Sequence, residues 1–203
     1  MAALQTVRNS KLLRVLASAF ATMLIVTGCS SGEPEASDAG STPTSIVIAD
    51  NEPPQTFDPI QAGNSTVNAV VIPLYDTLID FDANNELGSR LAESWTVSDD
   101  GLNISMTLRS GVKFHDGAEV TSADVQYTLD RVKLLGVGVA GEVVAYDSTT
   151  VTDALNFTIT LSSPSAPFLS ALSRIYILNS ALVKANEGSD SGQAWLSSND
   201  AGS

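Results

Sequence analysis

The spacing of apolar residues changes several times along the chain, and each spacing predicts a different element. Residues 45–50 form a short apolar run that ends before two prolines, which predicts a buried strand. Over residues 66–81 the apolar residues recur at helical spacing, and Pro73 should kink this helix or mark its first turn. The apolar side of the predicted helix consists of Val67, Val70, Val71, Leu74 and Leu78.

Two later segments alternate apolar and polar residues, which predicts strands with one buried face. Residues 95–109 contain two such runs joined by the turn tripeptide Asp99-Asp100-Gly101, and this arrangement predicts a β-hairpin. Residues 156–161 predict a further strand. The buried faces should consist of Ile104, Met106 and Leu108 in the hairpin and of Phe157, Ile159 and Leu161 in the later strand.

Helix signals lie between and after these strands. Thr121 has the position of an N-cap and Asp124 lies at N3, where a carboxylate favours the helix dipole. The helix should run to about residue 133, and residues 168–172 should form another helix after two prolines. Residues 175–178 predict a short strand, whereas the glycine-rich stretch 135–151 is ambiguous. The whole pattern predicts an α+β fold, with Val125, Leu129 and Val132 as the core stripe of the first helix.

The N-terminus has the organisation of a secretion signal. Residues 1–14 are basic, and residues 15–26 are an apolar run, too short for a bilayer span of ~20 residues but typical of a signal peptide. The tetrapeptide Val-Thr-Gly-Cys at 26–29 resembles the lipobox of bacterial lipoproteins, which implies cleavage before Cys29 and diacylglycerol on its sulfur. The alternative is a buried free cysteine. Cys29 is the only cysteine, so no intrachain disulfide can form and the domain depends on its core.

Composition completes the domain organisation. Residues 30–45 are rich in Ser, Gly, Pro and acidic residues and predict a flexible tether. We therefore assign residues 1–28 to a signal peptide, 29–44 to the tether and 45–203 to the folded part. The net charge is -13, and loss of residues 1–28 removes three of the 10 basic residues and none of the 23 acidic ones, leaving -16. So acidic a chain argues against nucleic acid and anionic lipid as partners.

His115 is the only histidine and carries the one enzyme hypothesis that the sequence offers. It could act as a general base, with Asp116 beside it and Ser110 or Ser122 near in sequence. No G-x-S-x-G or H-E-x-x-H motif is present, and one histidine with one cysteine cannot build a metal site of those ligands. Alternatively, Phe114-His115-Asp116-Gly117 is a strand–turn–helix corner, in which Asp accepts backbone N–H groups and Gly takes a positive φ.

A longer pattern surrounds this corner. Residues 91–125 contain LA-x-x-W, then D-G, then LR-x-G-V-x-F-x-D-G, then T-x-x-D-V. This pattern resembles the signature of the family 5 extracellular solute-binding proteins, the dipeptide-, oligopeptide- and nickel-binding components of ABC importers. One departure is Ser122-Ala123, where the family commonly has a single small residue. Residues 54–59, 74–82 and 156–172 resemble further family segments, so the resemblance extends from about residue 45 to 203.

The resemblance implies part of the N-terminal lobe of a two-lobed periplasmic-binding-protein (type II) clamp, which closes on its ligand by a hinge motion. It implies an extracytoplasmic, non-enzymatic lipoprotein, anchored to the cell membrane through Cys29, that captures peptides by their backbone and delivers them to an ABC permease. No cofactor or metal is implied. Alternative ligands are a nickel chelate, a sugar or a signalling peptide. The residues that then belong to the fold and not to a catalytic site are Trp95, Arg109, Phe114, His115, Asp116, Gly117 and Asp124.

The resemblance also places a ligand-contacting loop directly after Asp58-Pro59. This loop consists of Gln61, Ala62, Gly63, Asn64 and Ser65. Its glycine permits close backbone approach and its asparagine offers both a donor and an acceptor, although the loop could equally be a linker with the serine as an N-cap. Family chains are longer, and the tail resembles the segment just before their G-T-G-P-Y motif. We therefore expect the second lobe to be missing, with a truncated fragment without binding activity as the alternative.

Overall fold

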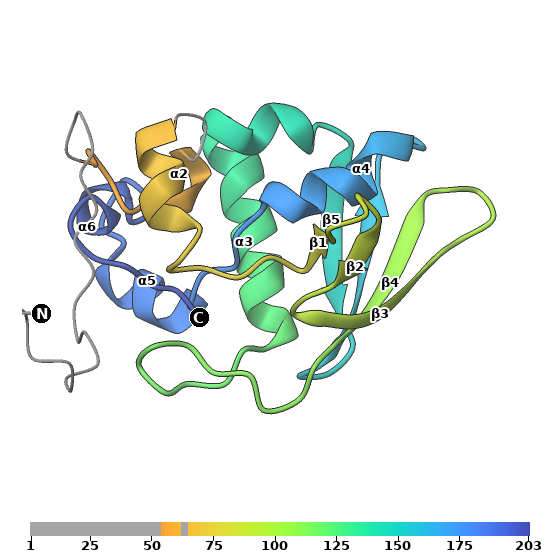
Figure 1. The fold of residues 1–203 in the computed structure, drawn as a ribbon, viewed down its shortest axis with the longest axis horizontal. Coiled ribbons are helices and arrows are strands. Elements are labelled where there is room, and N and C mark those ends of the chain that lie inside the picture. The colour runs from red at the N-terminus through yellow and green to blue at the C-terminus, as the bar shows by residue number, and fades with distance from the viewer. Residues whose placement is uncertain (1–53, 62–64) are drawn as a thin grey trace, which may run out of the picture. The chain divides into compact units, whose positions relative to one another are not determined.

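The computed structural model describes residues 54–61 and 65–203. The expected signal peptide, tether and first strand lie outside these residues. The centre of the fold is a four-stranded antiparallel sheet with the strand order β3-β4-β6-β5 (Figure 1). Its strands are β3 (Ala92–Val97), β4 (Asn103–Leu108), β5 (Tyr146–Val151) and β6 (Asn156–Leu161).

The alternating patterns predicted the central strands correctly. β3 and β4 form the expected hairpin, and every predicted inward residue of β4 and β6 is buried. The opposite face of these two strands carries only Ser, Thr and Asn side chains, because it faces solvent. The long helix α3 (Ser122–Leu135) covers the inner face, and its predicted stripe of Val125, Leu129 and Val132 is buried in the same core. Figure 1 shows α3 alongside the sheet.

The helix predicted over residues 66–81 is wrong beyond Val71. Helix α2 covers only Ser65–Val71, and a small antiparallel pair follows, made of β1 (Ile79–Phe81) and β2 (Leu87–Ser89). The physical reason is Pro73, which has no N–H to donate and whose ring would clash with a carbonyl of the preceding turn. The helical spacing past that point reflects burial of turn and strand residues.

The C-terminal part differs from expectation in two ways. Residues 175–178 form no strand, and Tyr176 makes only an isolated bridge with Thr77. The segment after them contains two helices that the sequence pattern did not predict, α5 (Ser180–Asn186) and α6 (Gln193–Leu196). The helix expected at 168–172 is present as α4 (Ala166–Ala171), continued by η3 (Leu172–Arg174). The remaining short helices are η1 (Pro59–Gln61) and η2 (Gly138–Glu142).

The buried apolar residues form two clusters. The larger lies between the sheet, α3 and α4, and includes Phe114. The smaller gathers segments that are far apart in sequence, from α2, α5, α6 and the last residues of the chain. Its buried members are Val67, Val71, Tyr75, Leu178, Val183, Leu196 and Ala201. Figure 1 shows α2, α5 and α6 at the end of the molecule away from the sheet, and this second core supports the segment that leads to the predicted ligand loop.

Candidate functional site

A buried ion pair fixes the turn from which the predicted ligand loop departs. Arg131 of α3 forms a two-pronged pair with Asp58, with Nη1–Oδ1 and Nη2–Oδ2 distances of 2.9 and 2.6 Å. Both side chains are buried, with exposed fractions of 2% and 0%. Arg131 Nε also donates to the carbonyl of Ser191 at 2.7 Å, and the backbone N–H of Ile60 donates to Asp58 Oδ1 at 3.2 Å. One guanidinium therefore joins the turn, α3 and the segment before α6.

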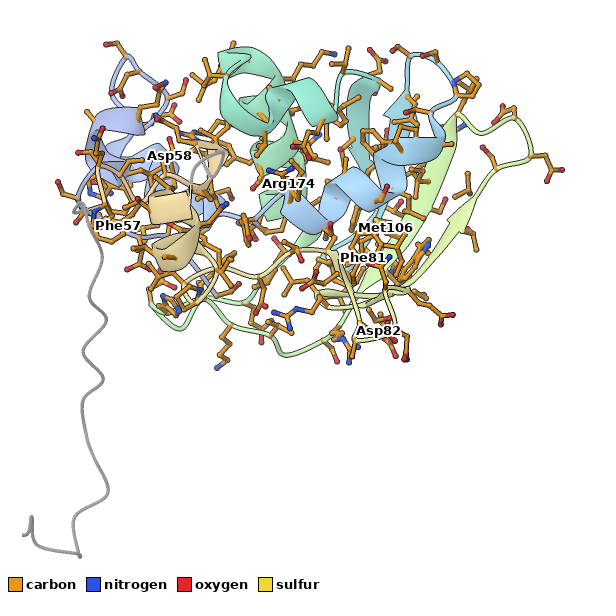
Figure 2. The ribbon with its side chains drawn as sticks, turned by 45° about the horizontal axis from the view of Figure 1, so that its top comes forward. Phe57, Asp58, Phe81, Asp82, Met106 and Arg174 are labelled. Carbon is orange, nitrogen blue, oxygen red and sulfur yellow. The ribbon has the colours of Figure 1, made fainter. Side chains whose placement is uncertain are left out.

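Tyr75 makes a second tie to the same turn. Its hydroxyl donates to the carbonyl of Phe57 at 2.9 Å and accepts the N–H of Ala201 at 3.1 Å. Burial raises the pKa of Tyr75, and the nearby carboxylates of Asp200 and Asp58 raise it further, against the opposing hydrogen bond from Ala201. The phenol therefore remains protonated and keeps its role as a donor. Figure 2 shows Phe57 and Asp58 at the end of the molecule that holds α2.

The Phe114–Gly117 corner is closed by its own backbone. The N–H of Phe114 donates to the carbonyl of Ala118, and the N–H of Gly117 donates back to the carbonyl of Phe114, both at 2.9 Å. Asp116 Oδ1 accepts the N–H of Ala118 at 2.9 Å, and Gly117 has a φ of 90°, which favours glycine. Phe114 itself is buried in the larger core. These contacts correspond to the strand–turn–helix corner described above.

The outer side of this corner holds the end of the chain. The backbone N–H of His115 donates to the carbonyl of Gly202 at 3.0 Å, and its imidazole Nδ1 lies 2.8 Å from Asp200 Oδ1. Asp116 Oδ2 accepts Asn179 Nδ2 at 2.8 Å. The His115 side chain is 48% exposed and its polar contact is a tail carboxylate. The geometry thus gives the corner a set of contacts that position the tail.

The other signature residues also make contacts within the fold. Arg109 Nε donates to the carbonyl of Arg90 at 2.6 Å, and Trp95 is half-buried on β3. Asp124 Oδ2 accepts the backbone N–H of Thr121 at 2.8 Å, which matches the predicted cap. Its Oδ1 accepts the N–H of Ser180, at the start of α5, at 2.9 Å. Asp124 therefore ties α3 to α5 as well as capping its own helix.

The predicted ligand loop is described only at its two ends. Gln61 is exposed at the end of η1, and α2 begins at Ser65. Ala62, Gly63 and Asn64 lie outside the described residues, as does Cys29. The sequence reasoning did not identify Arg131, although it lies between two residues of the α3 core stripe, and that position was the available signal.

Two features are absent from the described residues. Within 54–61 and 65–203, no cluster of three or more His, Cys, Asp or Glu side chains is placed to hold a metal ion. In the same part of the chain, no helix has the length and apolar character needed to cross a bilayer.

Comparison with known proteins gives the class. Residues 86–198 match the bacterial extracellular solute-binding proteins, family 5 (middle), and the chain belongs to this family of binding proteins. It is 32% identical over 165 residues to the probable D,D-dipeptide-binding periplasmic protein DdpA of Escherichia coli, a match that covers 78% of this chain and 32% of that protein. It is 35% identical over 133 residues to the glutathione-binding protein GsiB of Salmonella paratyphi A, covering 63% and 25%.

Solved structures agree with this assignment. The fold is similar to that of the binding protein AgaA from A. tumefaciens in complex with agropinic acid, with a TM-score of 0.62 and 27% identity over 67% of this chain and 28% of that one. The chain spans a third or less of the length of the relatives that it matches. The expected α+β fold, corresponding to part of a type II periplasmic-binding-protein chain, is thereby confirmed.

Proposed function

We propose that this chain captures peptides outside the cytoplasm as part of the solute-binding subunit of an ABC importer. The observation that carries the proposal is the family match over residues 86–198. The peptide class is supported by relatives named for a D,D-dipeptide and for glutathione. Main-chain recognition of a peptide suits an importer, because it accepts many side chains with one set of hydrogen bonds.

Residues 61–65 are the proposed ligand contact. The support for this placement is the turn before them, where Asp58 is held by a buried arginine and Phe57 by Tyr75. A loop that leaves a fixed turn can present its backbone to a ligand with little loss of conformational freedom on binding.

Titration calorimetry of the full chain with D-alanyl-D-alanine and with glutathione tests the proposal, with agropinic acid and a nickel–histidine chelate as the competing classes. Saturable heat with either peptide would support the peptide class of ligand. If Asn64→Ala weakens that binding about tenfold or more, the result would also support residues 61–65 as the ligand contact. His115→Ala should bind as the parent does, because the imidazole contacts Asp200 in the tail. Loss of binding in a folded His115→Ala chain would overturn the non-catalytic, structural role of the corner. Absence of heat with every probe would favour the fragment without binding activity.

The membrane anchor is a separate proposal that rests on the lipobox at 26–29. Cells fed labelled palmitate should incorporate label into the parent chain and not into Cys29→Ala, which should leave the membrane fraction. Two or more acyl chains give firm attachment because each buried CH₂ contributes about 0.8 kcal/mol. An unlabelled parent chain that still sediments with membranes would contradict the anchor.

A further inference from the structure

A small aromatic hollow lies beside the turn at Phe57, outside the predicted ligand loop. Its volume is about 240 Å³, and its lining residues are Phe57, Trp195, Ser198, Asn199 and Asp200. Both aromatic side chains are half-buried, and the Asp200 side chain is 38% exposed. None of the five lining residues is a lysine or an arginine. The hollow thus combines two ring systems with one carboxylate and two neutral polar groups.

The walls of the hollow are held by hydrogen bonds to backbone carbonyls before any ligand arrives. The N–H of Phe57 donates to the carbonyl of Leu196 at 2.9 Å, which joins the 56–58 segment to the end of α6. Asn199 Nδ2 donates to the carbonyl of Trp195 at 2.9 Å, and the N–H of Ser198 donates to the same carbonyl at 3.2 Å. A site framed in this way loses little conformational entropy when it binds.

Asp200 has one carboxylate oxygen in use and one available. Its Oδ1 lies 2.8 Å from the imidazole Nδ1 of His115 and accepts the N–H of Gly202 at 3.3 Å. Within residues 54–61 and 65–203, no hydrogen bond is made to Oδ2. The carboxylate is therefore oriented by one oxygen while the other can accept a donor from outside.

These features select for positive charge. Aromatic rings attract ammonium and guanidinium groups through their quadrupole, and a carboxylate adds a direct ion pair. A chain with a net charge of -13 also draws cations and repels anions. We propose that the hollow between Phe57, Trp195 and Asp200 binds a guanidinium or primary ammonium group. The inference does not depend on the ligand of the proposed 61–65 loop.

Tryptophan fluorescence tests the proposal directly, because the chain has only two tryptophans, Trp95 and Trp195. In the full chain carrying Trp95→Phe, the remaining fluorophore lies in the hollow. Ethylguanidinium should change its emission saturably in the millimolar range, whereas ethylurea, a neutral molecule of nearly the same shape, should not. Equal responses to the two probes would overturn the proposal.

Two variants in the same background locate the response. Asp200→Asn and Phe57→Leu should each weaken ethylguanidinium binding about fivefold or more, because each removes one attractive group. Asp147→Asn, which changes an exposed carboxylate on β5, should leave it unchanged. Unchanged binding in both hollow variants would overturn the proposal, and Phe57→Leu decides if Asp200→Asn does not fold.

The source of the cation is decided by a third comparison. A capped Gly-Arg-Gly peptide that binds at least tenfold more tightly than ethylguanidinium would assign the hollow to arginine side chains of peptides or proteins. Equal affinities would assign it to small free cations. Failure of both to bind would refute the site, whatever the outcome of the loop experiments.

Discussion

Arg131→Met should lower the free energy of unfolding more than the loss of any other single charged side chain discussed above. The substitution keeps an unbranched side chain of similar length in the α3 position and removes the guanidinium. Asp58 then loses both of its short contacts, at 2.9 and 2.6 Å, and the carbonyl of Ser191 loses its donor. Asp58 is fully buried, so water cannot replace what is lost.

The expected cost is about 3–5 kcal/mol, the range for removal of one partner from a buried pair. Part of the penalty is offset, because the N–H of Ile60 still donates to Asp58 Oδ1. The matched control is Arg90→Met. Arg90 pairs with Asp76 at 2.8 Å, but the two side chains are 48% and 34% exposed, so its loss should cost about 0–1 kcal/mol.

Urea unfolding followed by tryptophan fluorescence measures both variants, since Trp95 reports on the sheet and Trp195 on the second core. The double variant Asp58→Asn with Arg131→Met should be more stable than Arg131→Met alone, because it removes the unpaired buried charge. Equal free energies of unfolding for the Arg131→Met and Arg90→Met chains would refute the claim that the buried Arg131–Asp58 pair contributes more to stability than the exposed Arg90–Asp76 pair.

Three further predictions concern other parts of the fold. Gly202→Ala should lower the free energy of unfolding by about 1–3 kcal/mol or more, because an added Cβ would lie 1.8 Å from the carbonyl oxygen of Leu74. Thermal unfolding measures this loss, and the control Gly141→Ala should be near neutral because open space surrounds Gly141. Asp124→Ala should cost about 2 kcal/mol in urea unfolding, because two backbone N–H groups lose their acceptor. All four tyrosines have raised pKa values, and burial with a nearby carboxylate raises that of Tyr127 to about 12. A raised pKa means that the folded state favours the neutral phenol, so the contribution of Tyr127 to stability is intact below pH 10 and is lost as the pH rises toward 12. Near-ultraviolet absorbance should therefore show little tyrosinate at pH 10. Full ionisation of the tyrosines at that pH in a folded chain would contradict their burial.

Strands β3, β4 and β6 of the central sheet could be predicted because their signal is local, whereas β5 lies in the stretch 135–151 that the sequence left ambiguous. In β4 and β6, alternate residues face the core, and a period of two in the sequence is enough to assign both strands and their buried faces. The α3 cap at Thr121 and Asp124 is local in the same way. The prediction of a helix over residues 66–81 failed because Pro73 outweighs the apolar spacing. Helices α5 and α6 were missed because they are short, with 7 and 4 residues, and their burial comes from contacts with distant segments.

The contacts of the candidate site join residues that are far apart in sequence, so no local pattern could show them. Arg131 is 73 residues from Asp58, and Asp200 is 85 residues from His115. Sequence spacing predicts which face a residue occupies, whereas the partner on that face depends on how the elements pack. The family resemblance assigned His115 to the fold, and the contact of His115 with the tail follows only from the packing of the folded chain.

The distribution of polar ties follows from the unequal size of the two cores. The larger core is covered by a sheet and helices, but the smaller one has few buried residues and draws them from short helices and the chain end. Apolar burial is non-directional, so a small core alone would not fix how those segments meet. Directional contacts from Arg131, Tyr75 and the His115 corner supply that geometry at three separate points. A binding site needs its supporting segments held in one arrangement, and these ties give the 56–58 turn, from which the proposed ligand loop departs, that constancy.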